Sequence, residues 1–416
     1  MRTALLLSLC LSVACGDSGA GGSGGAGGSS NTAGGQSTGG APAGGADAGG
    51  GGAGGSVSVK GAAFFDTTTL HTVDIQVDDQ YLETLDADIT QRVPCTITYD
   101  GETVMNAGIR KKGQSTLRPL SDKPSFSVKL DETVAGQDID GIEKFALNNT
   151  IMDPTYTSEP LSYLLYSRAG IPAPRTAHAV VRFNGETKGF YVVVEATNKQ
   201  FLAEHYGDGS GNLYEGPWDF NQDPAAADLK DVEDGRTRDD LVALAQVVTN
   251  AADADLLSQL DPLMDVDEVL KTFALDMAFC LWDGYAIAAW NFYLYHVPNA
   301  RFVLLPHGAD WPYWHADVDP LNVDFRPWGA DYPAGSLAIR LTTGSFQSHY
   351  VDLLRTVRDQ AFDVAALQAR IDQIEGLIQS ADSGDPVLAQ AQADLAAGIG
   401  DARNFVAERR AFLDGY

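Results

Sequence analysis

Two carboxylates and one carboxamide occupy the ends of short predicted elements between residues 281 and 310. Asp283 lies in a predicted loop, Asn291 begins a predicted strand eight positions later, and Asp310 follows the two-strand hairpin that this strand opens. Phosphoryl transfer requires an acid that orients the acceptor hydroxyl and oxygen ligands that hold the metal ion of the nucleotide. The order of the three residues therefore predicts Asp283 as the catalytic Asp, which orients the acceptor hydroxyl, and Asn291 and Asp310 as ligands of Mg²⁺ or Mn²⁺.

Candidate phosphate-binding groups precede this stretch. Arg110 and Lys112 lie on one face of a predicted strand, and Lys129 lies on a later strand. Glu159 begins a predicted helix, where it could position a lysine, and Glu195 ends a predicted hairpin, as at a nucleotide-binding hinge. These five residues form the predicted cofactor-binding set, with ATP as the cofactor. Each also has an ordinary structural interpretation, because charged residues cover sheet edges and an acid favours a helix N-terminus.

The N-terminal residues differ in composition from the rest of the chain. Residues 1–15 contain one Arg, an apolar run and small residues before Cys15, which is typical of a secretory signal. The segment LSVACG resembles a bacterial lipobox in which Cys15 carries the lipid, with simple cleavage near Ala14 as the alternative. Residues 16–58 are Gly-rich and cannot offset their ordering entropy by burial. We therefore expect an exported protein, anchored by lipid to a bacterial membrane or cell surface through a flexible tether.

The net charge narrows the set of expected partners, and the cysteines limit the possible disulfides. The formal net charge is −28, which argues against nucleic acid, since phosphates need basic partners. It also disfavours adsorption on anionic lipid, so membrane contact is expected only through the lipid anchor, and no signal for oligomeric state is present. Cys95 and Cys280 are the cysteines of the folded body, and one disulfide or two buried free thiols fit equally well.

The pattern of elements predicts an α+β fold rather than a doubly wound sheet. Strands come early and helices late, with little alternation between them. Asp-Gly and Asn-Gly pairs between alternating runs predict two hairpins. Predicted strands and hairpins cover 71–77, 95–112, 124–130, 144–149 and 177–196, and predicted helices cover 79–88, 158–170, two segments within 239–279 and most of 349–416.

Several segments, taken together, resemble the spore-coat protein H (CotH) kinase-like family, whose members have an atypical kinase fold. The segments are GIRKKGQST (108–116), KPSFSVKL (123–130), FALNNTIMDPT (145–155), AGIPAPRTAHAVVRFNGETKGFYVVVE (169–195), GNLYEG (211–216) and NFYLY (291–295). The resemblance implies a domain over 59–416, with a strand-rich N-terminal lobe at about 60–195 and a helix-rich C-terminal lobe at about 196–416. It also implies ATP- and metal-dependent transfer of phosphate to Ser or Thr of a protein substrate.

The chain departs from the family pattern at one position. Many relatives read PWDLD where this chain reads Pro306-His307-Gly308-Ala309-Asp310, so Gly308 replaces the first acid. The loss of one carboxylate either weakens the binding of a metal ion or lets a water molecule occupy that ligand position. Two functions therefore stay open: an exported Ser/Thr protein kinase, and a catalytically inactive surface lipoprotein that binds or supports other molecules on a kinase-like scaffold.

Overall fold

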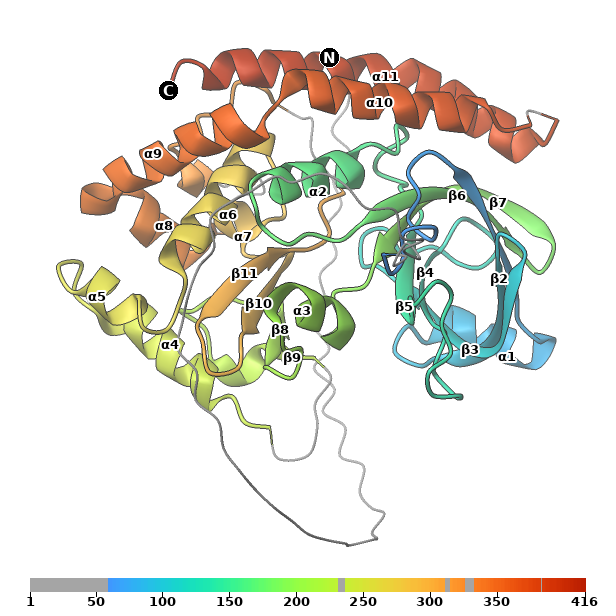
Figure 1. Cartoon of the computed structure of the whole chain (residues 1–416), viewed down its shortest axis with the longest axis horizontal. Helices are drawn as coiled ribbons and strands as arrows, with labels where there is room; N and C mark the ends of the chain where they lie inside the picture. The colour runs from blue at the N-terminus through green and yellow to red at the C-terminus, as the bar shows by residue number, and fades with distance from the viewer. Residues whose placement is uncertain (1–58, 231–235, 311–314, 326–332, 383) are drawn as a thin grey trace, which may run out of the picture. The chain divides into compact units, whose positions relative to one another are not determined.

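The computed structural model describes residues 59–230, 236–310, 315–325, 333–382 and 384–416 (Figure 1). The predicted signal segment and Gly-rich tether lie outside these residues. In the described part, strands and helices are mixed, as the sequence pattern predicts. No helix in that part has both the length and the apolar character that a membrane crossing requires.

Seven strands of the N-terminal half close into a barrel in the order β1-β2-β3-β4-β5-β7-β6. Neighbours pair antiparallel, except that β6 pairs in parallel with β1 and so completes the barrel. Alternating side chains of the strands point inward and fill the interior with apolar residues. The strands are β1 (Leu70–Gln76), β2 (Val93–Tyr99), β3 (Glu102–Lys112), β4 (Ser125–Lys129), β5 (Lys144–Asn148), β6 (Thr176–Phe183) and β7 (Glu186–Glu195).

Two helices accompany the barrel strands in sequence. Helix α1 (Asp79–Ala87) packs against β2 and β3, and helix α2 (Ser158–Arg168) follows β5. Asp153 holds the start of α2, since its carboxylate accepts the backbone N–H groups of Thr157 and Ser158 at 2.9 and 2.8 Å. An acid there satisfies N–H groups that have no partner within the helix.

The second half is rich in helices but contains a small sheet in the order β11-β10-β8-β9. Its strands are β8 (Leu213–Glu215), β9 (Asp228–Leu229), β10 (Phe292–His296) and β11 (Phe302–Pro306). The helices are α3 (Lys199–Tyr206), α4 (Asp239–Asn250), α5 (Leu256–Leu260), α6 (Val266–Phe279), α7 (Tyr285–Ala288), α8 (Ser336–Thr342), α9 (Gln347–Thr356), α10 (Val364–Gln379) and α11 (Pro386–Leu413).

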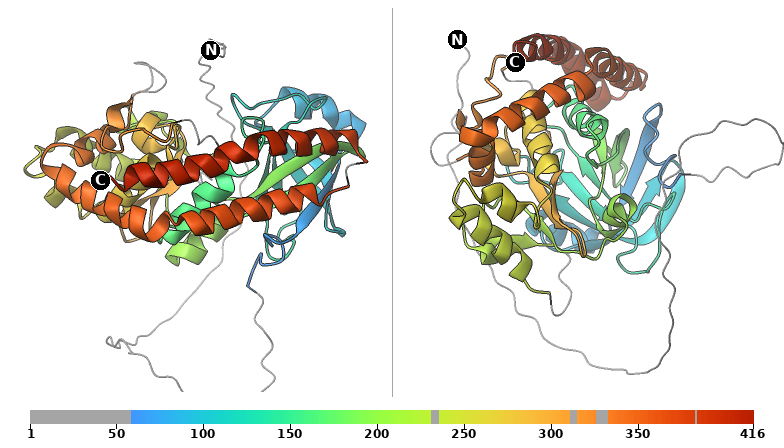
Figure 2. Two further views of the ribbon diagram at one scale, coloured as in Figure 1. Left: turned by 90° about the horizontal axis from the view of Figure 1, so that it is seen from above. Right: turned by 60° about the vertical axis from the view of Figure 1, so that its left-hand side comes forward.

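Helix α6 is the centre of the larger hydrophobic core. Eleven of its fourteen residues are buried, and it packs against α2, α7, α8, α9, α11 and β11. Helices α10 and α11 run side by side, and α11 also packs against β7 of the barrel (Figure 2). The sequence predicts two helices within 239–279, whereas the structure has three. The additional helix is the short α5, and α6 begins after it at Val266, where Asp265 accepts the N–H of Glu268 at 3.1 Å.

The two cysteines of the folded body are free thiols, and both are buried. Cys95 lies in the barrel core and Cys280 in the core around α6. The disulfide alternative is thereby excluded in this structure.

Candidate active site

A chain of hydrogen bonds connects the barrel to helix α2. Lys112, the last residue of β3, donates from Nζ to Oδ1 of Asn148 at 2.8 Å. Asn148, the last residue of β5, donates from Nδ2 to Oε2 of Glu159 at 2.6 Å. Tyr163, one turn along α2, lies with its hydroxyl 3.4 Å from the other oxygen of Glu159. A strand lysine is therefore tied to a helix glutamate through one amide.

Asp283, Asn291 and Gly308 form a second group in the helical half. The backbone N–H of Asn291 donates to the carbonyl oxygen of Asp283 at 2.5 Å. Its side-chain Nδ2 lies 3.0 Å from the carbonyl oxygen of Gly308 and 3.4 Å from Oδ2 of Asp283. Because the Asn291 amide nitrogen donates to these oxygens, its Oδ1 is directed away from them and is the atom suited to a metal ion.

Electrostatics connect the two groups through Asp310, which follows β11. Burial raises the pKa of Glu159 to about 7, with the charge of Asp310 adding to the effect and Lys112 opposing it. Burial also raises the pKa of Asp283 to about 7, again with a contribution from Asp310. The pKa of Asp310 itself is raised by burial and lowered in part by Lys112. Three acids and one lysine thus interact electrostatically, and burial favours the protonated, neutral form of each acid.

This donor set fits a hard divalent cation. Carboxylate and amide oxygens are the ligands that Mg²⁺ and Mn²⁺ prefer, and a bound cation would favour the charged form of these buried acids. No group of three or more His, Cys, Asp or Glu side chains within the described residues is arranged to hold a metal alone. Magnesium characteristically uses one or two carboxylates together with phosphate oxygens and water. Asn291 and Asp310 would hold such an ion jointly with a nucleotide.

At Gly308, where the family resemblance leads us to expect an acid, the local geometry is adapted to glycine. Its φ of +58° lies in the left-handed region, and a Cβ there would lie 2.7 Å from Nδ2 of Asn291. A side chain at 308 would therefore displace the Asn291 side-chain amide, which donates to the carbonyl oxygen of Gly308.

Three residues of the predicted cofactor-binding set lie outside this cluster. Lys129 is 37% exposed and pairs with Glu132 at 3.4 Å. Arg110 donates from Nη1 to the carbonyl oxygen of Ile89 at 2.8 Å. Glu195 binds the guanidinium of Arg175 through both carboxylate oxygens, which holds the end of β7 to the segment before β6. Of the predicted set, the structure brings Lys112 and Glu159 together with the three C-terminal residues.

Sequence reasoning missed Asn148 and Asp276. Asn148 joins Lys112 to Glu159, and its only signal was its place in the FALNN segment at the end of a predicted strand. Asp276 is buried in α6, where it accepts the hydroxyl of Tyr166 and the backbone N–H of Ala286. A single acid within an apolar helical run was the signal for it, because a buried acid needs partners.

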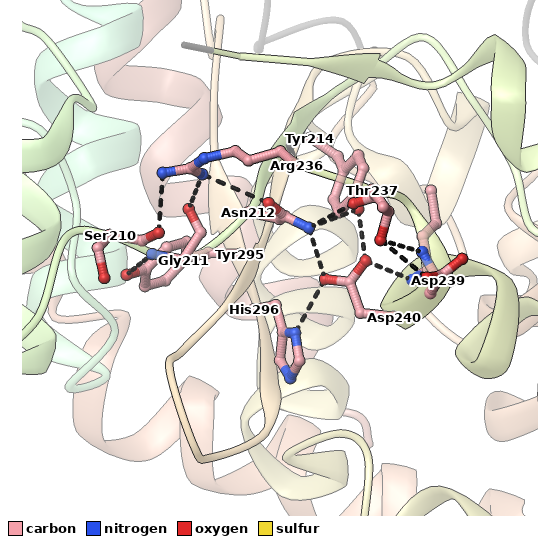
Figure 3. A network of polar contacts seen from close by, with 11 residues as sticks. Ser210, Gly211, Asn212, Tyr214, Arg236, Thr237, Asp239, Asp240, Tyr295 and His296 are labelled. Atoms are coloured by element: carbon pink, nitrogen blue, oxygen red, sulfur yellow. Dashed lines mark hydrogen bonds and ion pairs between the residues drawn. The ribbon is translucent and has the colours of Figure 1, made fainter. Parts of the chain in front are cut away.

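The loop at 207–212, with the sequence GDGSGN, does not form a phosphate cradle. Figure 3 shows the guanidinium of Arg236 directed at this loop, where it donates to the carbonyl oxygens of Ser210 and Gly211, both at 2.9 Å. A phosphate cradle requires backbone N–H groups that converge on the anion. Here the loop presents carbonyl oxygens to a cation, so it serves to hold the chain between β8 and α4.

Comparisons with known proteins agree with the family expectation. The CotH kinase protein family matches this chain over residues 109–413. Among solved structures, the chain is similar to the Helicobacter pylori proinflammatory kinase CtkA, with 10% sequence identity, coverage of 76% of this chain and 91% of that chain, and a TM-score of 0.28. So low a TM-score carries no structural argument. A comparison with curated proteins found no match. Because the family match extends over well more than half of its residues, this chain belongs to the CotH kinase family.

Proposed function

We propose that this chain is an atypical protein kinase that transfers the γ-phosphate of ATP to Ser or Thr of a protein substrate. The observation that carries the proposal is the convergence of the Lys112–Asn148–Glu159 hydrogen-bond chain with Asp283, Asn291 and Asp310. In this proposal, the barrel half at about 60–195 is the N-terminal lobe and the remainder is the C-terminal lobe. The nucleotide would lie between Lys112 and Asp310.

Each residue of the cluster has a role that its surroundings support. Lys112 would neutralise phosphate oxygens, and Glu159 would fix its ammonium through Asn148. Asp283 would accept a hydrogen bond from the acceptor hydroxyl, and its pKa of about 7 suits an acid that takes a proton near neutral pH. Asn291 and Asp310 would hold Mg²⁺ or Mn²⁺, which when bound neutralises charge on the transferring phosphoryl group.

An ATP-dependent phosphoryl-transfer assay tests the proposal. We expect Asp310→Ala to lower the rate roughly 100-fold or more, the size of effect seen when a group that stabilises transition-state charge is removed. Glu132→Ala is the matched control, because Glu132 pairs with Lys129 outside the cluster. Equal, background rates for wild type and Asp310→Ala would contradict kinase activity.

Gly308 favours a second candidate function, a binding or structural module that does not transfer phosphate. The site has one carboxylate fewer than the family pattern, and the structure leaves no room for a side chain at 308 without moving Asn291. Thermal unfolding with ATP and Mg²⁺ or Mn²⁺ distinguishes the two functions, since a ligand that binds only the folded state raises its stability. No shift at millimolar nucleotide would favour the second candidate.

We also propose that the protein is exported and lipid-anchored through Cys15, on the sequence of residues 1–15. A domain outside the cytoplasm meets little ATP, which adds weight to the second candidate. Membrane fractionation of wild type and Cys15→Ser tests the anchor. Retention of the variant in the membrane fraction would contradict it.

A further inference from the structure

One buried carboxylate connects two elements of the proposed active site. Asp276 lies in α6 and is 2% exposed. It accepts a hydrogen bond from the hydroxyl of Tyr166 on α2 and another, at 3.1 Å, from the backbone N–H of Ala286. Ala286 belongs to the short segment 281–289, which begins four residues before the N-terminal end of α7 and contains Asp283. The Asp276 carboxylate therefore joins α2 to the segment that carries Asp283, the proposed catalytic residue.

The contact between Asp276 and this segment is close. A Cβ at Gly284 would lie 2.6 Å from the carboxyl carbon of Asp276, so the backbone next to Asp283 packs directly against the acid. The backbone N–H of Gly284 also donates to the carbonyl oxygen of Leu281 at 2.9 Å, which folds the segment into a turn. The position of Asp283 is thus set by a turn that rests on Asp276.

Helix α2 also carries one acid of the site and touches the backbone beside another. Glu159 lies seven residues before Tyr166, two turns along the same face of α2. Ser162, between them, lies with its hydroxyl 3.4 Å from the carbonyl oxygen of Ala309, the residue before Asp310. One helix therefore carries Glu159, touches the backbone beside Asp310, and reaches the Asp283 segment through Asp276.

We propose that Asp276 is a positioning residue that, together with Tyr166, couples helix α2 to the segment carrying Asp283. The inference rests on the proposed kinase function, in which Asp283 orients the acceptor hydroxyl. A buried acid is costly unless its oxygens are satisfied, and here the two donors come from the two elements that have to stay in register. Displacement of either element misaligns Asp283 with Glu159, and a misplacement of about 1 Å lowers a rate by as much as 100-fold.

Tyr166→Phe tests the coupling, and Tyr214→Phe is its matched control. Both tyrosines are 1% exposed, and each donates a hydrogen bond to a buried or partly buried aspartate. Tyr214 donates to Asp240 at 2.6 Å in the network of Figure 3, away from the proposed site. We expect Tyr166→Phe to lower kcat roughly 10-fold while KM for ATP stays within about twofold, because nucleotide contacts are untouched. Tyr214→Phe should leave both constants within about twofold. A kcat for Tyr166→Phe equal to that of the control would overturn the inference.

Hydrogen–deuterium exchange gives a second readout that does not depend on catalysis. In Asp276→Ala and Tyr166→Phe, amides of 281–289 should exchange roughly 10-fold faster than in wild type, and those of Tyr214→Phe should not. Unchanged exchange in this segment would overturn the inference whatever the activity. Faster exchange together with an inactive wild type would support the positional coupling and count against the proposed kinase function.

Discussion

At the scale of single residues, Lys112 and Lys129 are both strand lysines predicted to bind phosphate, but their surroundings in the structure differ. Strands β3 and β4 pair antiparallel, with Lys112 opposite Ser125 and Lys129 opposite Gly108. The two lysines therefore lie at opposite ends of the strand pair, about 13 Å apart along the strand direction at ~3.3 Å per residue. Only the end that holds Lys112 adjoins Asn148 and Glu159. Which of the two lysines reaches the site thus depends on the register in which the strands pair. Short-range sequence patterns do not specify that register.

Substitution of the two lysines should separate them functionally. We expect Lys112→Met to lower kcat/KM for ATP roughly 100-fold, since it removes the cation tied to Asn148 and leaves the acids of the site uncompensated. Lys129→Met removes an exposed pair with Glu132 and should change kcat/KM less than about twofold. Steady-state kinetics at varied ATP measure both. An equal loss in the two variants would contradict the assignment of Lys112.

At the scale of elements, local patterns predicted much of the fold. The hairpins at Asp100-Gly101 and Asn184-Gly185 and the strands around them appear where the alternation places them, because turn chemistry and strand period act over a few residues. The end of helix α6 depends instead on contacts from distant parts of the chain. Arg409 of α11 donates to the carbonyl oxygens of Met277 and Ala278, 132 and 131 residues away, and to those of Ala316 and Val318.

The same distinction divides the candidate site. The order Asp283, Asn291, Asp310 can be read from the sequence because Asn291 and Asp310 flank the open end of one hairpin and Asp283 lies only eight residues before Asn291. The Asp276–Tyr166 bond spans 110 residues, and the Asn148–Lys112 bond spans 36. The first pair depends on how α2 packs against α6 and the second on how the barrel strands pair, and both are decided by packing rather than by local propensity. Sequence therefore indicated the acids that define the site but not the groups that hold them in place.

Arg409 should be among the most important side chains for stability. It is fully buried and satisfies carbonyl groups at the C-terminal end of α6, which have no partners within the helix. We expect Arg409→Met to lower the free energy of unfolding by roughly 3 kcal/mol, because several charge-assisted hydrogen bonds are lost and buried carbonyl oxygens are left without donors. Urea denaturation measures the change.

The control for Arg409 lies on the same helix. Arg403 pairs with Asp372 and Glu375 near the surface, so Arg403→Met should cost less than about 1 kcal/mol. Arg409→Lys should fall between the two, since an ammonium has fewer donors than a guanidinium and no fork geometry. A cost for Arg409→Met as small as that of Arg403→Met would show that the α6 end is held by other contacts.

At the scale of the whole molecule, His178 lies where the barrel meets the helical half. It stands on β6 with no exposed surface, and its Nε2 lies 3.0 Å from the carbonyl oxygen of Tyr156. A ring nitrogen beside a carbonyl carries a proton, so Nε2 is the donor in this contact. Its Nδ1 is buried and makes no hydrogen bond within the described residues. Burial lowers the pKa of His178 to about 3, and the charge of Arg370 on α10 adds to the effect.

The lowered pKa makes stability depend on pH in a defined direction. Above the ordinary value of 6.5, His178 is neutral in both folded and unfolded chains and contributes no pH dependence. Between 6.5 and about 3, the unfolded chain takes up a proton that the folded chain refuses, so the free energy of unfolding falls as pH falls. The slope approaches about 1.4 kcal/mol per pH unit for one group, which amounts to roughly 2 kcal/mol between pH 7 and pH 4.5.

Comparison with a variant isolates this contribution from those of the other titrating groups. In His178→Gln, the side-chain amide can still donate to the carbonyl of Tyr156 but cannot be protonated. As the pH falls from 7 to 4.5, the wild type should therefore lose roughly 2 kcal/mol more unfolding free energy than the variant. His349→Gln is the control, because His349 is exposed and paired with Asp267 on the surface, and its difference should stay nearly constant. Urea denaturation at four or five pH values supplies the curves. If the wild-type and His178→Gln curves run parallel, the junction between barrel and helices accepts a proton at His178 without cost, and burial of the neutral ring is not what holds this histidine in the fold.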